Sequence, residues 1–457
     1  MTNTSTAQKN DPYPIKTAKI RPATITVPGS KSYSHRMAIA ASLASGTSEI
    51  HNLLKSEDLD HTLSALKQLG VRISRDNHTT TITGMNQNGR IRFNDAPPTP
   101  PPPTESLESL ESPESSASLY VGNSGTTMRL ITAVAALSPV TYRIHGTPRM
   151  HERPIGELLD ALNQLGVNAA SIHNNNCPPV EITGPLTTGG AVDLDCSVSS
   201  QYLSALLFIA PCLKNGLEIN LIKGLVSKPY VEMTIDIMNR FGINVHKKGD
   251  NYFRVPDHQT YKAGSHTVEP DCSQAGYFWA AAAITGVPVT VSGISRHSRQ
   301  GDVRFVHVLQ DMGCRIDDTN TGITVSRPAD HPLKAVAVDM QDMPDLVPTL
   351  AVVAAFAKGK TTIKNVAHLA AKESDRLSAT VNELTKMGIS ATKTKDGLAI
   401  TGGTPKGTII ETYDDHRIAM SFALAGLLVP DMAIANPKCV EKSFPEFWDV
   451  FEGLYDQ

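Results

Sequence analysis

The segment "SHRMAIAASLASG", residues 34–46, is rich in alanine and opens on a polar cluster. It decides the fold because segments of the same kind recur along the chain. They are anchored at Ser34, Ser124, Ser200, Ser273, Asp345 and Asp415. Successive anchors are 90, 76, 73, 72 and 70 residues apart. A nearly constant period of this length indicates one supersecondary unit repeated along the chain.

The first interval is the longest because it contains a segment rich in Pro, Ser and Glu, residues 94–118. Such a composition cannot bury enough apolar surface to become ordered, so we expect a flexible, exposed insertion. Removing about 18 residues of it restores a common period of about 72 residues.

A second element recurs between the alanine-rich segments. It is "LSALKQLGV" at residues 63–71, with counterparts at 159–167, 235–243, 306–314 and 381–389. Apolar residues at i, i+3 and i+6 predict one buried helix face, and the glycine predicts a left-handed C-terminal cap. Alternating segments such as "VTYRIHG", residues 140–146, predict strands after most of the alanine-rich helices. The pattern favours two domains of three repeats each.

The alanine-rich helices are apolar nearly all round, which predicts that they are buried at the centre of each domain. Each segment opens with Ser or Asp, which are good N-caps. If three such helices run parallel in each domain, their N-termini converge on one surface. Unpaired N–H groups and positive dipole ends would then favour anionic ligands, so we expect an anion site between the two domains.

Composition excludes several classes of function. The formal net charge of the 457-residue chain is −3, which gives no support to a nucleic-acid partner. The first residues lack the apolar core of a signal peptide, and no apolar run is long enough to span a membrane. Six scattered cysteines without a C-x-x-C pair are typical of reduced thiols, so we expect a cytoplasmic protein without membrane partners.

Short motifs at or near the helix starts carry candidate chemistry. "PGSKSYSHR", residues 28–36, resembles a phosphate-binding loop, but Ser30 precedes Lys31 where a nucleotide-binding P-loop has glycine. "GNSGTTMR", residues 122–129, has glycines that let a ligand approach the backbone, and "RMHERP", residues 149–154, offers arginines that suit phosphate or carboxylate.

Further polar clusters are "SVSSQY" (197–202), "VSKPY" (226–230), "MPDLVPT" (343–349), "KESDR" (372–376), "DDHR" (414–417) and "EKSFP" (441–445). Taken singly, helix capping or exposed ion pairs explain these clusters almost as well as a ligand site does. None has the spacing of a metal site.

Taken together and in this order, the motifs resemble those of the 5-enolpyruvylshikimate-3-phosphate synthase family across essentially the whole chain. The resemblance implies an α/β fold: a two-domain inside-out α/β barrel built from six βαβαββ-type repeats, with the active site in the interdomain cleft. Residues 1–28 and 270–457 would form one domain, and residues 29–269 the other.

The resemblance also implies the activity. The enolpyruvyl group of phosphoenolpyruvate would pass to the 5-hydroxyl of shikimate 3-phosphate by addition and elimination of phosphate. This transferase step belongs to the shikimate pathway of chorismate and aromatic amino acid biosynthesis. No cofactor and no metal are implied, a monomer is expected, and the domains would close over the substrates.

Site residues are carried over from the family at matching positions. The shikimate 3-phosphate set is Lys31, Ser32, Arg36, Ser199, Ser200, Gln201, Ser227, Tyr230, Asp345 and Lys372. The phosphoenolpyruvate set is Lys31, Asn123, Gly125, Arg153, Gln201, Arg376, Arg417 and Lys442. The catalytic set is Asp345 as base at the hydroxyl, Glu373 as proton donor and acceptor at C3, and Lys31 and His416 beside the reacting carbons.

Some positions depart from the family pattern. His368 and Ala370 stand where the family often has Asn and Arg. Ser124 and Leu130 stand where Ala and Pro are common, in the region that the inhibitor glyphosate would occupy as a mimic of phosphoenolpyruvate.

Two alternatives compete with this interpretation. One is the related enolpyruvyl transferase for UDP-N-acetylglucosamine, which has Asn after the lysine and uses a loop cysteine, whereas Ser32 follows Lys31 here. The other is a non-catalytic repeat protein that binds anions through its helix ends.

Overall fold

The computed structural model describes residues 11–77, 79–87, 90–93 and 117–456. The chain divides into two compact units. Unit 1 comprises Met1–Pro28 and Pro270–Gln457, and unit 2 comprises Gly29–Glu269. Most of the insertion expected at residues 94–118 lies outside the described residues, and its last two residues belong to a strand.

The three four-stranded sheets of unit 2 share one pairing order, in which a parallel strand is followed by antiparallel ones. The first contains β16 (Ser265–Thr267), β3 (Thr47–His51), β5 (Thr79–Thr83) and β4 (Arg72–Arg75). The second contains β8 (Ala117–Tyr120), β9 (Tyr142–His145), β11 (Val180–Thr183) and β10 (Asn168–Ser171). The third contains β12 (Thr188–Asp195), β13 (Lys214–Lys223), β15 (Tyr252–Val255) and β14 (His246–Lys248). A short hairpin joins β6 (Asn86–Gln87) to β7 (Arg90–Ile91).

Unit 1 has two sheets of the same order and a third that is smaller. They are β2 (Ala23–Ile25), β17 (Val289–Ser292), β19 (Gly322–Ser326) and β18 (Arg315–Thr319), then β20 (Ala337–Asp339), β21 (Lys360–Lys364), β23 (Leu398–Thr401) and β22 (Ser390–Lys393). The third has only β24 (Ile409–Ile410), β25 (Ala433–Ile434) and β1 (Tyr13–Pro14). The sixth repeat therefore departs from the predicted pattern, because its last strand comes from the N-terminal segment.

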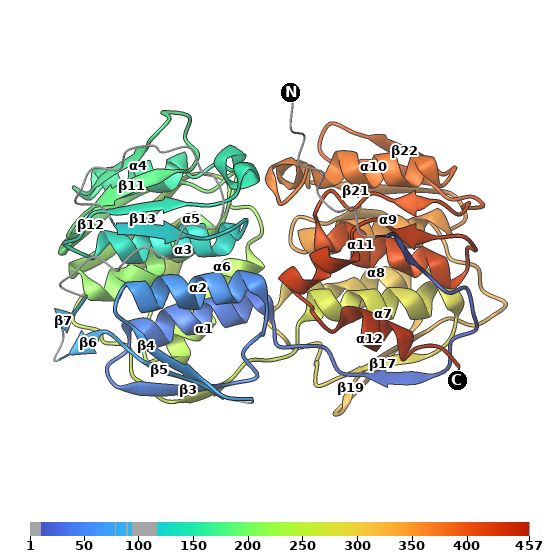
Figure 1. Ribbon diagram of the computed structural model, residues 1–457, viewed down its shortest axis with the longest axis horizontal. Coiled ribbons are helices and arrows are strands. Elements are labelled where there is room, and N and C mark those ends of the chain that lie inside the picture. The colour runs from blue at the N-terminus through green and yellow to red at the C-terminus, as the bar shows by residue number, and fades with distance from the viewer. Residues whose placement is uncertain (1–10, 78, 88–89, 94–116, 457) are drawn as a thin grey trace, which may run out of the picture. The chain divides into compact units, whose positions relative to one another are not determined.

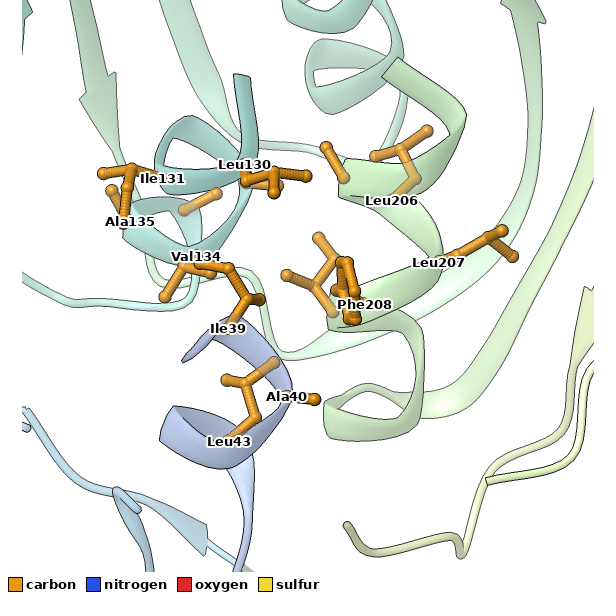
Figure 2. Close-up of a cluster of buried hydrophobic side chains, with 14 of the residues drawn as sticks. Ile39, Ala40, Leu43, Leu130, Ile131, Val134, Ala135, Leu206, Leu207 and Phe208 are labelled. Atoms are coloured by element: carbon orange, nitrogen blue, oxygen red, sulfur yellow. The ribbon is translucent and has the colours of Figure 1, made fainter. Parts of the chain in front are cut away.

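The alanine-rich segments form the central helices that the sequence predicts. They are α1 (Lys31–Leu43), α3 (Gly125–Ala136), α5 (Gln201–Ile209), α7 (Cys272–Thr285), α9 (Val347–Ala355) and α11 (His416–Ala423). Figure 1 shows α1 and α3 lying between the sheet of β3 and the sheet of β11 within unit 2. In Figure 2, fully buried side chains of α1, α3 and α5, among them Ile39, Val134 and Phe208, meet in the core.

The outer helices end where the repeated glycines predict. They are α2 (Glu57–Gln68), α4 (Gly156–Gln164), α6 (Pro229–Arg240), α8 (Phe305–Asp311) and α10 (Arg376–Lys386), with α12 (Phe447–Glu452) in the sixth repeat. The glycine after each of the first five has a positive φ, for example 109° at Gly70 and 78° at Gly388. Each glycine takes the left-handed conformation that ends a helix at low steric cost.

Short 3-10 segments connect several elements. They are η1 (Pro148–Glu152), η2 (Ala210–Cys212), η3 (Gly301–Arg304), η4 (Pro344–Leu346), η5 (Ala367–Ala371), η6 (Leu424–Leu427) and η7 (Pro437–Lys442). No helix in the part of the chain that the structure describes is both long and apolar enough to cross a membrane.

The N-cap predictions are correct for some helices and wrong for others. Ser124 and Asp415 accept hydrogen bonds from the first turns of α3 and α11 as expected. By contrast, Ser30 caps α1 and Asp271 caps α7, so Ser34 and Ser273 lie inside their helices. Asp345 is not a cap, because η4 intervenes before α9 and directs its carboxylate to two arginines.

Candidate active site

In unit 1, Arg376 at the start of α10 is the centre of a cluster of carboxylates. Its guanidinium donates to Asp345 Oδ1, Glu373 Oε2 and Asp415 Oδ2, each at 2.8 Å. The side chain of Arg376 is only 2% exposed. Burial in a low dielectric makes these charge-assisted bonds strong, so η4, the segment after η5 and the start of α11 are fixed around one cation.

A second arginine joins the cluster from α11. Arg417 Nη2 donates to Asp345 Oδ2 at 3.0 Å, and Arg417 Nη1 donates to the hydroxyl of Tyr277 on α7 at 3.1 Å. Asp345 therefore bridges two buried guanidinium groups. Burial alone would raise the pKa of Asp345, but Arg417 and Arg376 hold it well below its usual range.

The other candidates of unit 1 lie at the ends of short helices or at the start of α11. Glu373 and Lys372 directly follow η5, and His416 is the first residue of α11, where it is 1% exposed. Lys442 ends η7 and is 7% exposed. Nearby His368 is half-buried, and burial together with Lys372 lowers its pKa to about 3, so it is a neutral imidazole at physiological pH.

Asp302 in η3 is a buried carboxyl that sequence reasoning missed. It is 5% exposed, and its Oδ1 has no hydrogen-bond partner among the described residues. Burial, followed by the charges of Asp345 and Asp271, raises its pKa well above the usual range. The neutral form of Asp302 is therefore favoured in the folded chain.

Replacing Asp302 by Asn should stabilise the protein at pH 8. Above the ordinary aspartate pKa of about 4, the folded chain holds a proton that the unfolded chain releases, so stability falls as pH rises. Asn cannot ionise and escapes this loss, which we expect to be worth about 1–3 kcal/mol. Urea unfolding at pH 8 should show the gain, and at pH 4 the two proteins should converge. Equal or lower stability of Asp302→Asn at pH 8 would contradict this assignment.

In unit 2, Lys31 in the first turn of α1 forms an ion pair with the carboxylate of Asp58 on α2. Asp58 is 2% exposed, so the ammonium group has a buried counter-charge. The ammonium group of Lys31 lies at the positive end of the α1 dipole, an arrangement that suits an anionic ligand.

Arg36 lies on a different side of α1 from Lys31. Its Nε donates to Thr234 Oγ1 on α6 at 2.8 Å, and its Nη1 donates to the carbonyl oxygen of Ser32 at 3.0 Å. The guanidinium lies 5.8 Å from the ring centroid of Tyr230. The structure thus brings together Ser32, Arg36 and Tyr230, three members of the predicted shikimate 3-phosphate set.

Gly125 begins α3 against two arginines. A Cβ at this position would lie 2.3 Å from Arg153 Nη2 and 2.6 Å from Arg129 Nη1, so a larger residue would displace them. Arg153 is 4% exposed, and its Nη1 donates to the carbonyl oxygen of Asn123 at 2.8 Å. The absent side chain therefore lets two guanidinium groups approach the helix start, as a phosphate site requires.

Gln201, the first residue of α5, is held by α3. Its Oε1 accepts from Arg129 Nη1 at 2.9 Å, and its Nε2 donates to Thr126 Oγ1 at 2.9 Å. Ser199 Oγ accepts from the Gln201 backbone N–H at 3.3 Å, and Ser200 is the N-cap residue of α5. The remaining candidate, Ser227, is 5% exposed with a φ of 52° just before α6.

The residues that depart from the family pattern differ in burial and in the elements they contact. Leu130 is 1% exposed and packs into the core with α5 (Figure 2). Ser124 is fully buried, and its hydroxyl caps α3. Ala370 is exposed near the end of η5.

Sequence reasoning also missed the side chains that position the predicted ones. They are Asp58, Arg129, Tyr277 and Asp415. Asp415 was visible in the "DDHR" cluster, and Arg129 in "GNSGTTMR". Asp58 had no signal of its own, since an acidic residue in a first helix turn is ordinary. Among the described residues, no group of three His, Cys, Asp or Glu side chains is arranged to hold a metal ion.

Buried arginines and carboxylates gathered at helix starts define a class of two-unit α/β proteins equipped to bind anions and move protons. The sequence model of a family described as EPSP synthase (3-phosphoshikimate 1-carboxyvinyltransferase) matches residues 16–97 and 104–451. The chain therefore belongs to the EPSP synthase family.

Individual relatives agree with this membership. The chain is 41% identical to the chloroplastic 3-phosphoshikimate 1-carboxyvinyltransferase of Brassica napus, over 98% of this chain and 86% of that protein. It is 42% identical to the 3-phosphoshikimate 1-carboxyvinyltransferase of Colwellia psychrerythraea, over 93% of this chain and 95% of that protein. A solved structure of EPSP synthase from Acinetobacter baumannii has a TM-score of 0.77 and 27% identity, covering 97% of this chain and 98% of that chain.

Proposed function

We propose that this chain transfers the enolpyruvyl group of phosphoenolpyruvate to the 5-hydroxyl of shikimate 3-phosphate, releasing phosphate. Family membership supports this reaction, and the activity is that of a transferase in the shikimate pathway. The observation that carries the proposal is the meeting of Asp345 and Glu373 on Arg376, because the reaction needs two proton-carrying groups beside an anion site.

The chemistry assigns a role to each carboxylate. The 5-hydroxyl attacks C2 of phosphoenolpyruvate and loses its proton to Asp345, while C3 gains a proton from Glu373. The resulting tetrahedral intermediate expels phosphate as C3 returns a proton to Glu373. Lys31 and His416 lie beside the reacting carbons in this assignment, where cationic or polar groups stabilise developing charge.

The anions of the two substrates are assigned to the cationic side chains. Phosphoenolpyruvate uses Arg376, Arg417 and Lys442 of unit 1, with Lys31, Asn123, Gly125, Arg153 and Gln201 of unit 2. Shikimate 3-phosphate uses Asp345 and Lys372 of unit 1, with Lys31, Ser32, Arg36, Ser199, Ser200, Gln201, Ser227 and Tyr230 of unit 2.

Asp345 poses a physical question for this mechanism, because a carboxylate held by two arginines is a weak base. Arg376 and Arg417 are also the groups assigned to the phosphoenolpyruvate anion. When that anion takes some of their N–H donors, Asp345 loses part of its stabilisation and its pKa rises. Substrate binding would thus make Asp345 a better base at the moment it is needed.

A coupled assay of phosphate release tests the function. The protein is supplied with phosphoenolpyruvate and with shikimate 3-phosphate, UDP-N-acetylglucosamine or no acceptor. We expect phosphate release with shikimate 3-phosphate alone. Phosphate release with UDP-N-acetylglucosamine would indicate the related transferase instead. No phosphate release with any acceptor would favour a non-catalytic binding protein.

The predictions of a monomer and of a cytoplasmic location rest on the family resemblance and the scattered cysteines. Sedimentation velocity would test the first, and a single species of monomer mass is expected. Whether glyphosate inhibits this protein is tested by adding it to the same phosphate-release assay.

A further inference from the structure

The first two turns of α1 present two different sets of side chains to its neighbours. Lys31 and His35, one helical turn apart, contact α2, whereas Arg36 contacts α5 and α6. Under the proposed function, Lys31 serves both substrates, whereas Arg36 serves shikimate 3-phosphate alone. His35 has no role in that assignment, although it is fully buried.

His35 begins a chain of short hydrogen bonds through three helices. Its Nδ1 lies 2.7 Å from Thr62 Oγ1 on α2, and Thr62 Oγ1 lies 2.7 Å from Thr127 Oγ1 on α3. Thr127 Oγ1 donates to Ser124 Oγ at 2.7 Å or to the carbonyl oxygen of Asp58 at 3.2 Å. His35, Thr62, Thr127 and Ser124 are all 0% exposed, so no water replaces these bonds.

The acceptors at the Thr127 end determine which group donates in each of these hydrogen bonds. Since Thr127 donates to Ser124 or Asp58, Thr62 must donate to Thr127, and His35 Nδ1–H must donate to Thr62. The other tautomer would bury an N–H at His35 Nε2, which has no partner among the described residues. Burial lowers the pKa of His35 to about 3, so the ring is neutral and carries its one proton on Nδ1.

This series of hydrogen bonds ends on groups that flank the phosphoenolpyruvate candidates of unit 2. Asp58, whose carbonyl oxygen can accept from Thr127, pairs with Lys31 through its carboxylate. Ser124, the other acceptor, caps α3 between Asn123 and Gly125.

We propose that His35, acting through Thr62 and Thr127, is a positioning residue that holds Lys31 and the loop at residues 122–125 in register for phosphoenolpyruvate. This inference rests on the proposed function. A buried polar chain fixes one arrangement of three helix starts, whereas apolar packing alone would allow them to slide. The Arg36 side of α1 lies outside these hydrogen bonds, and the loop at residues 122–125 is assigned only to phosphoenolpyruvate, so the larger effect falls on that substrate.

Thr62→Val is the direct test, because it removes the central hydroxyl at nearly constant shape. We expect the KM for phosphoenolpyruvate to rise about 5-fold or more, as for loss of a buried hydrogen bond, and the KM for shikimate 3-phosphate to rise less. His35→Leu should give the same split. His35→Asn, which keeps a donor near Nδ1, should restore the wild-type KM.

Thr132→Val is the matched control. Thr132 is fully buried on α3, and its hydroxyl bonds to Met128 of its own helix. It should lower the melting temperature without changing either KM. The proposal is overturned if Thr62→Val and His35→Leu change both KM values equally or neither, or if both fail to fold.

Ligand-observed NMR of phosphoenolpyruvate binding separates this proposal from the proposed function. If the wild-type protein does not convert the two substrates, the proposed function is wrong. Weaker binding of phosphoenolpyruvate to Thr62→Val than to wild type would still support the positioning role. Equal binding to both proteins would reject it.

Discussion

Glu373→Gln should bind both substrates and turn them over about 10²- to 10⁴-fold more slowly, the usual contribution of a general acid–base group. Glu373 Oε2 accepts from Arg376 Nη2 at 2.8 Å, and the amide oxygen of Gln can accept the same bond. The shape and the arginine contact therefore persist, but the amide cannot deliver or remove a proton at C3. Steady-state kinetics should show a fall in kcat with little change in either KM.

Glu383→Gln is the control for this variant. Glu383 on α10 is fully buried and accepts from the Tyr413 hydroxyl at 2.8 Å, in the same unit but outside the candidate site. It should alter stability and leave kcat close to wild type. Near-normal turnover by Glu373→Gln would remove Glu373 from its proposed role.

Arg376→Met should lower the free energy of unfolding by about 3–5 kcal/mol, the cost of leaving buried charges without their partner. Arg376 neutralises Asp345, Glu373 and Asp415, and Asp415 is fully buried. Met fills similar space but offers no N–H group, so these carboxylates must repel one another or take up protons. Urea unfolding at pH 7 measures the loss.

Arg304→Met provides the comparison. Arg304 pairs with Asp342 at 2.7 Å, but the arginine side chain is 58% exposed. An exposed pair contributes about 0–1 kcal/mol, so this variant should unfold nearly as wild type does. If both variants lose a similar free energy of unfolding, burial does not strengthen the ion pairs of Arg376, and the prediction is wrong.

Much of the fold could be predicted because the alanine-rich segments and the glycine-ended helices recur at a nearly constant interval in the sequence. The glycines that end the outer helices take a positive φ at low steric cost, and the alanine-rich helices have no polar face to expose. The incomplete sixth sheet could not be predicted, because Tyr13–Pro14 pairs with strand residues more than 400 positions away. The caps at Ser30 and Asp271 were missed because neighbouring polar residues compete for the same place.

The candidate site could be predicted as a set of residues but not as a set of contacts. Motifs placed Lys31 and Arg376 at helix starts, where anion binding has a physical reason. Asp58, the ion-pair partner of Lys31, comes from the outer helix of the same repeat, and Asp302 comes from a different repeat than Arg376; acidic residues of this kind are common on helix surfaces. Only the packing of the helices shows that these two carboxyls are buried beside the site.

The most direct test of the central claim is phosphorus NMR of phosphoenolpyruvate and shikimate 3-phosphate with a catalytic amount of the protein. The account predicts that inorganic phosphate appears as phosphoenolpyruvate disappears, in equal amounts. Shikimate 3-phosphate should convert to a phosphate monoester heavier by one enolpyruvyl group, C₃H₂O₂, by mass spectrometry. Phosphoenolpyruvate that persists unchanged, or that releases phosphate equally without shikimate 3-phosphate, would contradict the account.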